Sequence, residues 1–143
     1  RSQDTLSTPF SESTLGEQLL APTKIYVKSL LELHKHINIH ALSHITGGGL
    51  LENIPRVLPA NVDAILDSSS WQRPAIFDWL QKEGNIIDEE MYRTFNNGIG
   101  MVVCVAKEDV MNTLQHLANS GENATVIGHV ANSDSVEPSV KIL

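Results

Sequence analysis

The sequence predicts an α+β domain in which a mixed sheet of about four to five strands is covered by helices, in a three-layer α/β/α-like arrangement. Three observations lead to this prediction. Hydrophobic periods typical of helices and of strands alternate along the chain, 41% of its 143 residues are apolar, and only three Phe, two Trp and two Tyr are present. A chain of this length suits one domain, and its core must be mainly aliphatic.

The N-terminal segment is polar, rich in Ser and Thr, and has no sustained hydrophobic period. We therefore predict that residues 1–18 form a linker or lead-in arm and that residues 19–143 form the domain. No long apolar run resembles a signal peptide. The chain begins at Arg1 instead of Met, which indicates a piece of a larger protein.

A helix is expected to begin at Pro22 and to end near Asn38, because apolar side chains recur there at helical spacing. The stripe consists of Tyr26, Leu30, Leu33 and Ile37. Residues 39–45 alternate between two faces and predict a strand. Thr46 and three glycines follow directly, and residues 50–53 predict one or two turns of helix.

The middle of the chain contains three further elements and one long apolar run. Residues 61–67 predict a second strand. A helix is expected around residues 74–83, with Gly84 as the residue that ends it. Residues 88–95 predict a short helix whose acidic start suits the helix dipole. The nearly continuous apolar run over residues 99–106 predicts a strand buried on both faces.

The C-terminal part is expected to contain a helix over residues 108–120, ended by Gly121. Two strands are expected over residues 124–130 and 136–142, the second with the weaker pattern. The chain has no internal repeat. The predicted strands and helices therefore alternate along the chain, as expected for a sheet that is covered by helices.

The charge balance limits the function classes. Ten Lys and Arg stand against 17 Asp and Glu, a net charge of -7, so no nucleic-acid partner is expected. No apolar run approaches the roughly 20 residues that span a bilayer, so no membrane partner is expected. The single cysteine, Cys104, excludes a disulfide framework and indicates a reducing, cytoplasmic location. Its place in the most apolar strand favours an inert thiol.

The strongest local signal for a binding site is the strand end at His44, followed by Thr46, Gly47, Gly48 and Gly49 and then a helix. Glycine lets a ligand approach the backbone closely, and free amides at such a turn favour phosphate or carboxylate. The alternative is a tight turn that binds nothing, and both interpretations stay open. A Walker A loop is excluded because no Lys-Ser or Lys-Thr pair follows.

Other polar residues give weaker signals. Four histidines lie close together in the sequence: His34, His36, His40 and His44. On a strand, His40 and His44 would stand about 13 Å apart, whereas zinc ligands lie about 2.0–2.1 Å from the ion, so no metal site is predicted. Arg56 and Arg93 could each pair with a phosphate or with an acidic neighbour.

Four blocks of sequence occur in order: Leu19–Lys28 (LLAPTKIYVK), His44–Gly49 (HITGGG), Glu52–Pro59 (ENIPRVLP) and Glu90–Asn96 (EMYRTFN). Together they resemble the C-terminal half of the phosphoribosylformylglycinamidine cyclo-ligases, also called aminoimidazole ribonucleotide synthetases. The resemblance runs from about Leu15 to the C-terminus.

This resemblance implies a two-domain enzyme that forms a homodimer through its N-terminal domains. With ATP and Mg²⁺, such an enzyme cyclises formylglycinamidine ribonucleotide to aminoimidazole ribonucleotide in purine synthesis, by phosphoryl activation of the amide oxygen and attack of the amidine nitrogen. The family holds ATP mainly in the N-terminal domain, which this chain lacks. We therefore expect the chain to need that domain as its partner and to be inactive alone.

By the same resemblance, His44 and the backbone of residues 46–49 line the substrate cleft, with His44 as the hydrogen-bonding or proton-transfer group. Four further residues match the other motifs and would bind substrate or phosphate, or brace the fold: Asn53, Arg56, Arg93 and Asn96. The family often has Cys where this chain has Asn97, which argues against a catalytic thiol there.

Two alternatives stay open. One is a non-catalytic domain of the same fold that binds a phosphate ligand or a partner. The other is a kinase or a relative of selenophosphate synthetase, although the blocks over residues 53–59 and 91–96 resemble the cyclo-ligase more.

Overall fold

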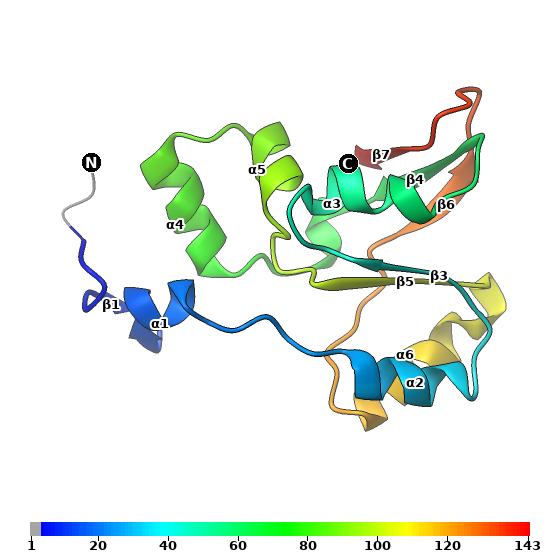
Figure 1. Ribbon diagram of the computed structural model, residues 1–143, viewed down its shortest axis with the longest axis horizontal. Helices are drawn as coiled ribbons and strands as arrows, with labels where there is room; N and C mark the ends of the chain where they lie inside the picture. The colour runs from blue at the N-terminus through cyan, green and yellow to red at the C-terminus, as the bar shows by residue number, and fades with distance from the viewer. Residues whose placement is uncertain (1–3) are drawn as a thin grey trace.

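The computed structural model describes residues 4–143 and confirms the α+β class (Figure 1). The elements follow one another in this order: β1 (Pro9–Phe10), β2 (Ser13–Thr14), α1 (Leu15–Leu19), α2 (Val27–His34), β3 (Ile39–His44), α3 (Gly49–Asn53), η1 (Pro55–Val57), β4 (Val62–Leu66), η2 (Ser68–Ser70), α4 (Ala75–Gly84), α5 (Asp88–Thr94), β5 (Met101–Val105), η3 (Lys107–Asp109), α6 (Val110–Asn119), β6 (Gly128–Asn132) and β7 (Ser139–Ile142).

The strands differ from the prediction in one respect, because they form separate sheets instead of one. β3 pairs with β5 antiparallel, whereas β4 lies between β6, which is antiparallel to it, and β7, which is parallel. The strand expected over residues 124–130 begins only at Gly128, and residues 122–127 have no regular structure. A Cβ at Gly128 would lie 2.0 Å from the Ile65 carbonyl oxygen, so β6 approaches β4 closely where glycine allows it.

Two apolar clusters hold the elements together. One lies around β4 and α3 and includes Leu50, Ile54 and Leu66; the other joins α2 to α6 through Leu33 and Leu117. β5 contributes to both clusters, as expected for a strand with two apolar faces. Its five residues are nevertheless only half-buried, so the prediction of full burial was wrong.

The described part of the predicted linker, residues 4–18, contains regular structure. β1 and β2 form a short hairpin, and α1 begins with a capping box between Thr14 and Glu17. Trp79 of α4 contacts this segment through an edge-to-face contact with Phe10. Residues 1–3 lie outside the described part of the chain, and the division of the chain at residue 19 stays a prediction.

Two helices are shorter or end differently than expected. α2 begins at Val27, and residues 21–26 form a stretch without regular structure between α1 and α2 (Figure 1). Pro22 disfavours helical geometry at Ala21, the first residue of this stretch. At the end of α4 the left-handed residue is Asn85, with φ of 48°, and not Gly84. Asparagine tolerates this region better than most residues.

Candidate functional site

The glycine-rich turn joins the end of β3 to the start of α3. Gly48 and Gly49 have φ of 100° and 54°, values that favour glycine. The Gly49 amide donates to the Thr46 carbonyl oxygen at 3.0 Å, so it is already used within the turn. The amides of Gly47 and Gly48 donate to no acceptor among residues 4–143. These two amides are therefore the ones that the turn can offer to a ligand.

The three glycines have different surroundings. A Cβ at Gly49 would lie 2.1 Å from the Tyr92 carbonyl oxygen, which shows that α3 starts in close contact with α5. A Cβ at Gly47 would meet no atom within 4 Å, and this residue is exposed. Gly49 thus serves packing, and only Gly47 borders open space.

Asn53 stabilises the turn from its buried side. Its Nδ2 donates to the carbonyl oxygens of Gly49 at 2.8 Å, Gly47 at 3.1 Å and Thr46 at 3.3 Å. The residue is 5% exposed. Asn53 is therefore placed to fix the backbone of the turn.

His44 is the last residue of β3 and is exposed. It lies opposite Met101 in the β3–β5 ladder, and the next amide, that of Ile45, donates to the Gly100 carbonyl oxygen at 3.0 Å. The imidazole meets the Tyr26 ring at a centroid distance of 6.1 Å and an interplanar angle of 70°. The strand end that carries His44 is thus tied to the turn before β5.

The two arginines have different surroundings. Arg93 lies on α5 beside three carboxylates: its guanidinium is 2.6 Å from Glu89, 3.7 Å from Glu90 and 4.0 Å from Glu52. Arg56 is exposed in η1 and forms no ion pair with any residue in the range 4–143. Each arginine was expected to pair with a phosphate or with an acidic neighbour. Arg93 pairs with acidic neighbours, whereas the Arg56 guanidinium has no carboxylate partner among residues 4–143.

Asn96 and Asn97 shape the turn before β5. The Asn96 Oδ1 accepts the Gly98 amide at 3.0 Å. Asn97 is fully buried with φ of 50°, and its Nδ2 donates to the carbonyl oxygens of Met91 at 2.9 Å and Phe95 at 3.1 Å. Asn97 was not among the predicted site residues. The sequence signal for it was the Asn97-Gly98 pair, because asparagine tolerates the positive φ that such a turn requires.

Sequence reasoning also missed a polar cluster at residues 24–29. Lys24 Nζ donates to Glu122 Oε2 at 2.5 Å, and Ser29 Oγ donates to Glu122 Oε1 at 2.5 Å. Lys24 and Ser29 hold the pKa of the Glu122 carboxyl below its usual value. The only sequence signal for this cluster was that Lys24 and Glu122 fall within stretches that resemble the family.

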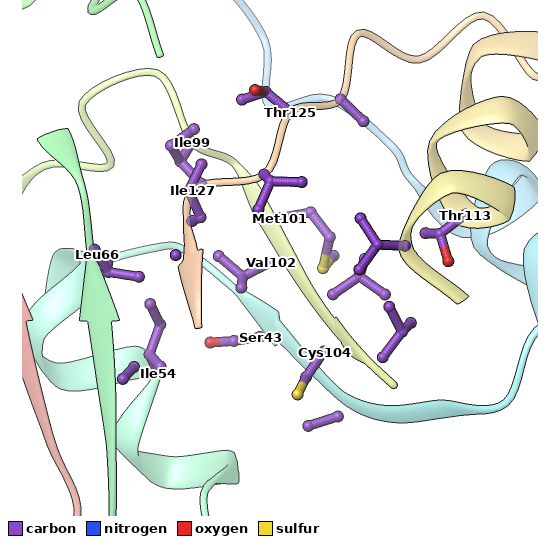
Figure 2. A pocket seen from close by; sticks show the side chains of 18 of the residues that line it. Ser43, Ile54, Leu66, Ile99, Met101, Val102, Cys104, Thr113, Thr125 and Ile127 are labelled. Atoms are coloured by element: carbon purple, nitrogen blue, oxygen red, sulfur yellow. The ribbon is translucent and has the colours of Figure 1, made fainter. Parts of the chain in front are cut away.

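A cavity of about 1620 Å³ lies beside this region, between β5, α6 and the β4–β6 pair (Figure 2). Its walls are mostly aliphatic, with Ser43 and Cys104 among the side chains that line it. Burial raises the pKa of the Cys104 thiol, so the thiolate is disfavoured there. None of the predicted site residues lines this cavity. Tyr26, which does line the cavity, contacts the His44 ring, so the cavity adjoins the strand end that carries His44.

Within residues 4–143, no group of three or more His, Cys, Asp or Glu side chains is arranged to hold a metal ion. None of the helices in this range has both the length and the apolar character needed to cross a membrane.

Comparison with known proteins gives a family and several relatives. The family described as "AIR synthase related protein, C-terminal domain" matches residues 1–141. The chain is 51% identical over 142 residues to phosphoribosylformylglycinamidine cyclo-ligases from two strains of Coxiella burnetii, covering 99% of this chain and 40% of theirs. It is 56% identical over 130 residues to the Nitrosococcus oceani protein of the same name, covering 91% of this chain and 36% of that protein. The chain thus spans about 40% of the length of these relatives or slightly less.

Solved structures agree with the fold. A crystal structure of Escherichia coli HypE, a hydrogenase maturation protein, superposes with a TM-score of 0.61 at 22% identity, over 90% of this chain and 39% of that one. A second HypE structure gives a TM-score of 0.60 at 20% identity, over 90% of this chain and 40% of that one. At this level of identity the likeness supports the fold alone.

Proposed function

Because the chain belongs to the AIR synthase related family, as its C-terminal domain, we propose that it forms the substrate-cleft part of an ATP-dependent cyclo-ligase. The proposed reaction closes formylglycinamidine ribonucleotide to aminoimidazole ribonucleotide in purine biosynthesis. Support comes from relatives that carry the cyclo-ligase name and match nearly the whole chain at 51–56% identity.

One observation carries the assignment of the cleft. Gly47 is exposed beside open space, the amides of Gly47 and Gly48 donate to no acceptor among residues 4–143, and His44 precedes Gly47 by three positions in the chain. Backbone amides of this kind bind anionic groups without a side-chain charge. Because the chain has a net charge of -7, a phosphorylated substrate needs such local donors.

The proposed roles divide between contact and support. His44 donates a hydrogen bond to the substrate or transfers a proton. The amides of Gly47 and Gly48, beside Thr46, bind the anionic group of the substrate. Arg56 provides the uncommitted positive charge for a phosphate. Three residues act through the backbone or through neighbouring side chains: Asn53, Asn96 and Arg93. Gly49 keeps α3 against α5.

ATP and Mg²⁺ are proposed to bind mainly to an N-terminal domain that precedes this chain in the whole cytoplasmic enzyme, which dimerises through that domain. This division fits the 40% of the relatives' length that the chain spans. No catalytic step on this chain is assigned to the metal or the nucleotide, and phosphoryl transfer depends chiefly on positioning the nucleotide phosphates. We therefore propose that these 143 residues bind substrate but do not turn it over.

The test compares the chain alone with the polypeptide in which the N-terminal domain precedes it. We expect ATP-dependent cyclisation only from the longer polypeptide. There, His44→Ala should lower kcat/KM by about 10²-fold, the size of a general acid–base contribution. His40→Ala, a second exposed histidine of β3, is the matched control and should leave turnover unchanged.

Two results would contradict the proposal. Cyclisation by the 143-residue chain alone would refute the division between the domains. If His44→Ala kept the kcat/KM of the parent, as the His40→Ala control should, His44 would have no part in the reaction. In that case, equal affinity of the chain for inorganic phosphate and for substrate would favour the non-catalytic phosphate-binding alternative.

A further inference from the structure

We infer that Tyr26 is a positioning residue for His44, and that the ion pair between Lys24 and Glu122 holds Tyr26 in place. The inference rests on the proposed function, because it gives His44 a role in the cleft. It gives a role to residues 21–26, the stretch without regular structure before α2, which belongs to the first family-like block but has no place in the proposed chemistry.

The contact between the two rings is the first observation. The Tyr26 and His44 rings meet edge to face, at 6.1 Å between centroids and 70° between planes. Such aromatic contacts favour one orientation over others. His44 stands at an exposed strand end, and no hydrogen bond to its imidazole is made within residues 4–143. The contact with the Tyr26 ring can therefore restrict the His44 rotamer.

Tyr26 is itself fixed from two directions. On one side, a Cβ at Gly100 would lie only 2.0 Å from Tyr26 Oη, so the phenol packs directly against the Gly100 backbone. Gly100 in turn accepts the amide of Ile45, the residue that follows His44. The phenol thus lies against the same turn to which the strand end of His44 is tied.

On the other side, Lys24 holds the stretch. Lys24 Nζ lies 5.7 Å from the Tyr26 ring centroid and is paired with Glu122 Oε2. The Glu122 side chain is only 13% exposed and also accepts the Ser29 hydroxyl of α2. Its backbone amide donates to the Leu117 carbonyl oxygen of α6 at 2.9 Å. Glu122 therefore connects α6, α2 and the stretch that carries Tyr26.

These contacts predict how substitutions at Tyr26 should behave. Tyr26→Phe keeps the ring edge and should position His44 as well as tyrosine does. Tyr26→Leu keeps apolar packing but loses the aromatic edge, and Tyr26→Ala loses both. A misplacement of about 1 Å at a reacting group costs on the order of 10²-fold in rate. The loss should appear mainly in kcat, because the Gly47 and Gly48 amides and Arg56, which are proposed to bind the anionic group, stay in place.

Two measurements test the inference. In the polypeptide with its N-terminal domain, Tyr26→Leu and Tyr26→Ala should lower kcat by at least about tenfold with little change in KM, and Tyr26→Phe should restore kcat. In the same variants, NMR of the His44 ring protons should show the Tyr26 ring-current shift retained in Tyr26→Phe and lost in Tyr26→Leu. Glu122→Gln should give an intermediate kcat.

The outcomes separate this inference from the proposed function. If His44→Ala reduces turnover but Tyr26→Leu, folded by circular dichroism, keeps the kcat of Tyr26→Phe, the positioning role is refuted. It is also refuted if the His44 ring shifts are the same in all Tyr26 variants. If His44→Ala leaves turnover unchanged while the ring shifts depend on Tyr26, the proposed function fails and the contact is structural only.

Discussion

The side-chain amide of Asn53 lies 2.8 Å from the Gly49 carbonyl oxygen, on the buried side of the turn whose outer side exposes Gly47. One nitrogen also serves the carbonyls of Thr46 and Gly47, so a single side chain sets the path of the backbone between β3 and α3. The conformation of the amides proposed to bind the substrate therefore depends on a buried side chain behind them.

Removing this side chain should loosen the turn. We expect Asn53→Ala to lower the free energy of unfolding by about 1–3 kcal/mol, because buried carbonyl oxygens lose their donor. Asn53→Asp should cost more, since it places carboxylate oxygens against carbonyl oxygens. Urea unfolding of both variants measures the difference. Asn119→Ala, at an exposed position on α6, is the control and should stay within about 0.5 kcal/mol of the parent.

Alanine substitution at two glycines of the same turn should change stability by very different amounts. Gly49→Ala puts a Cβ 2.1 Å from the Tyr92 carbonyl oxygen at a φ of 54°, so it should destabilise the chain by on the order of 2–4 kcal/mol or prevent folding. Gly47→Ala meets no atom within 4 Å and should change stability by less than about 1 kcal/mol. Thermal unfolding compares them. Equal stability of the two variants would contradict the described packing of α3 on α5.

Alanine substitution of Arg56 and of Arg93 should change the affinity for substrate by different amounts. Arg56 has no carboxylate partner among the described residues, so Arg56→Ala should raise the dissociation constant for formylglycinamidine ribonucleotide by about tenfold or more. Arg93→Ala should change that constant by less than about twofold, because Glu89, Glu90 and Glu52 already surround the guanidinium. Calorimetric titration of the polypeptide with its N-terminal domain provides the measurement. A reversed order would assign the phosphate to Arg93.

Asp63 should make the stability of the β4–β7 pair depend on pH. Its carboxylate is buried on β4 and accepts bonds from Lys141 at 2.9 Å and from the Ser139 hydroxyl at 2.8 Å. These contacts hold the pKa of Asp63 well below its usual value. A carboxyl whose pKa is lowered on folding stabilises the protein above its unfolded pKa, about 3.9, and loses that contribution as the pH falls toward the folded pKa.

We therefore expect Asp63→Asn to lower the urea midpoint at pH 7, and the gap to the parent to narrow as the pH falls below about 4. Urea unfolding at pH 7, 5 and 3.5 measures that gap. Asp134→Asn, an exposed aspartate in the loop before β7, should match the parent at every pH. A gap of constant size would show that Asp63 acts through its shape and not through its charge.

Local pattern predicted most elements of this fold, because hydrophobic period and end-capping residues act over short distances. The α+β class, the strand at 39–45 and the short helix after the glycines follow from such signals, and the motif blocks identified the family. The division of the strands into separate sheets did not follow, because strand pairing joins residues far apart in the sequence, such as Asp63 with Ala131 and with Ser139.

The sequence motifs named candidate site residues, but not the contacts that each of them makes in the fold. The sequence indicated Asn53 and Arg93 as residues of interest, yet only the fold shows that one faces inward and the other is surrounded by Glu side chains. The partner of Lys24 could not be found from local sequence, because Glu122 is 98 positions away. Pairings over such separations carry no periodic signal.

The separation of Lys24 and Glu122 also bears on the order in which the chain folds. Lys24 and Glu122 are 98 positions apart, so bringing them together costs loop-closure entropy before the favourable energy of the contact is gained. Contacts of this kind therefore form late. The stretch that carries Tyr26 should dock only after α6 and the following loop have formed, and it should be among the first parts to detach. We expect its backbone amides to exchange hydrogen with solvent sooner than those of β4, so that the surroundings of His44 are the last part of this domain to be acquired and the first to be lost.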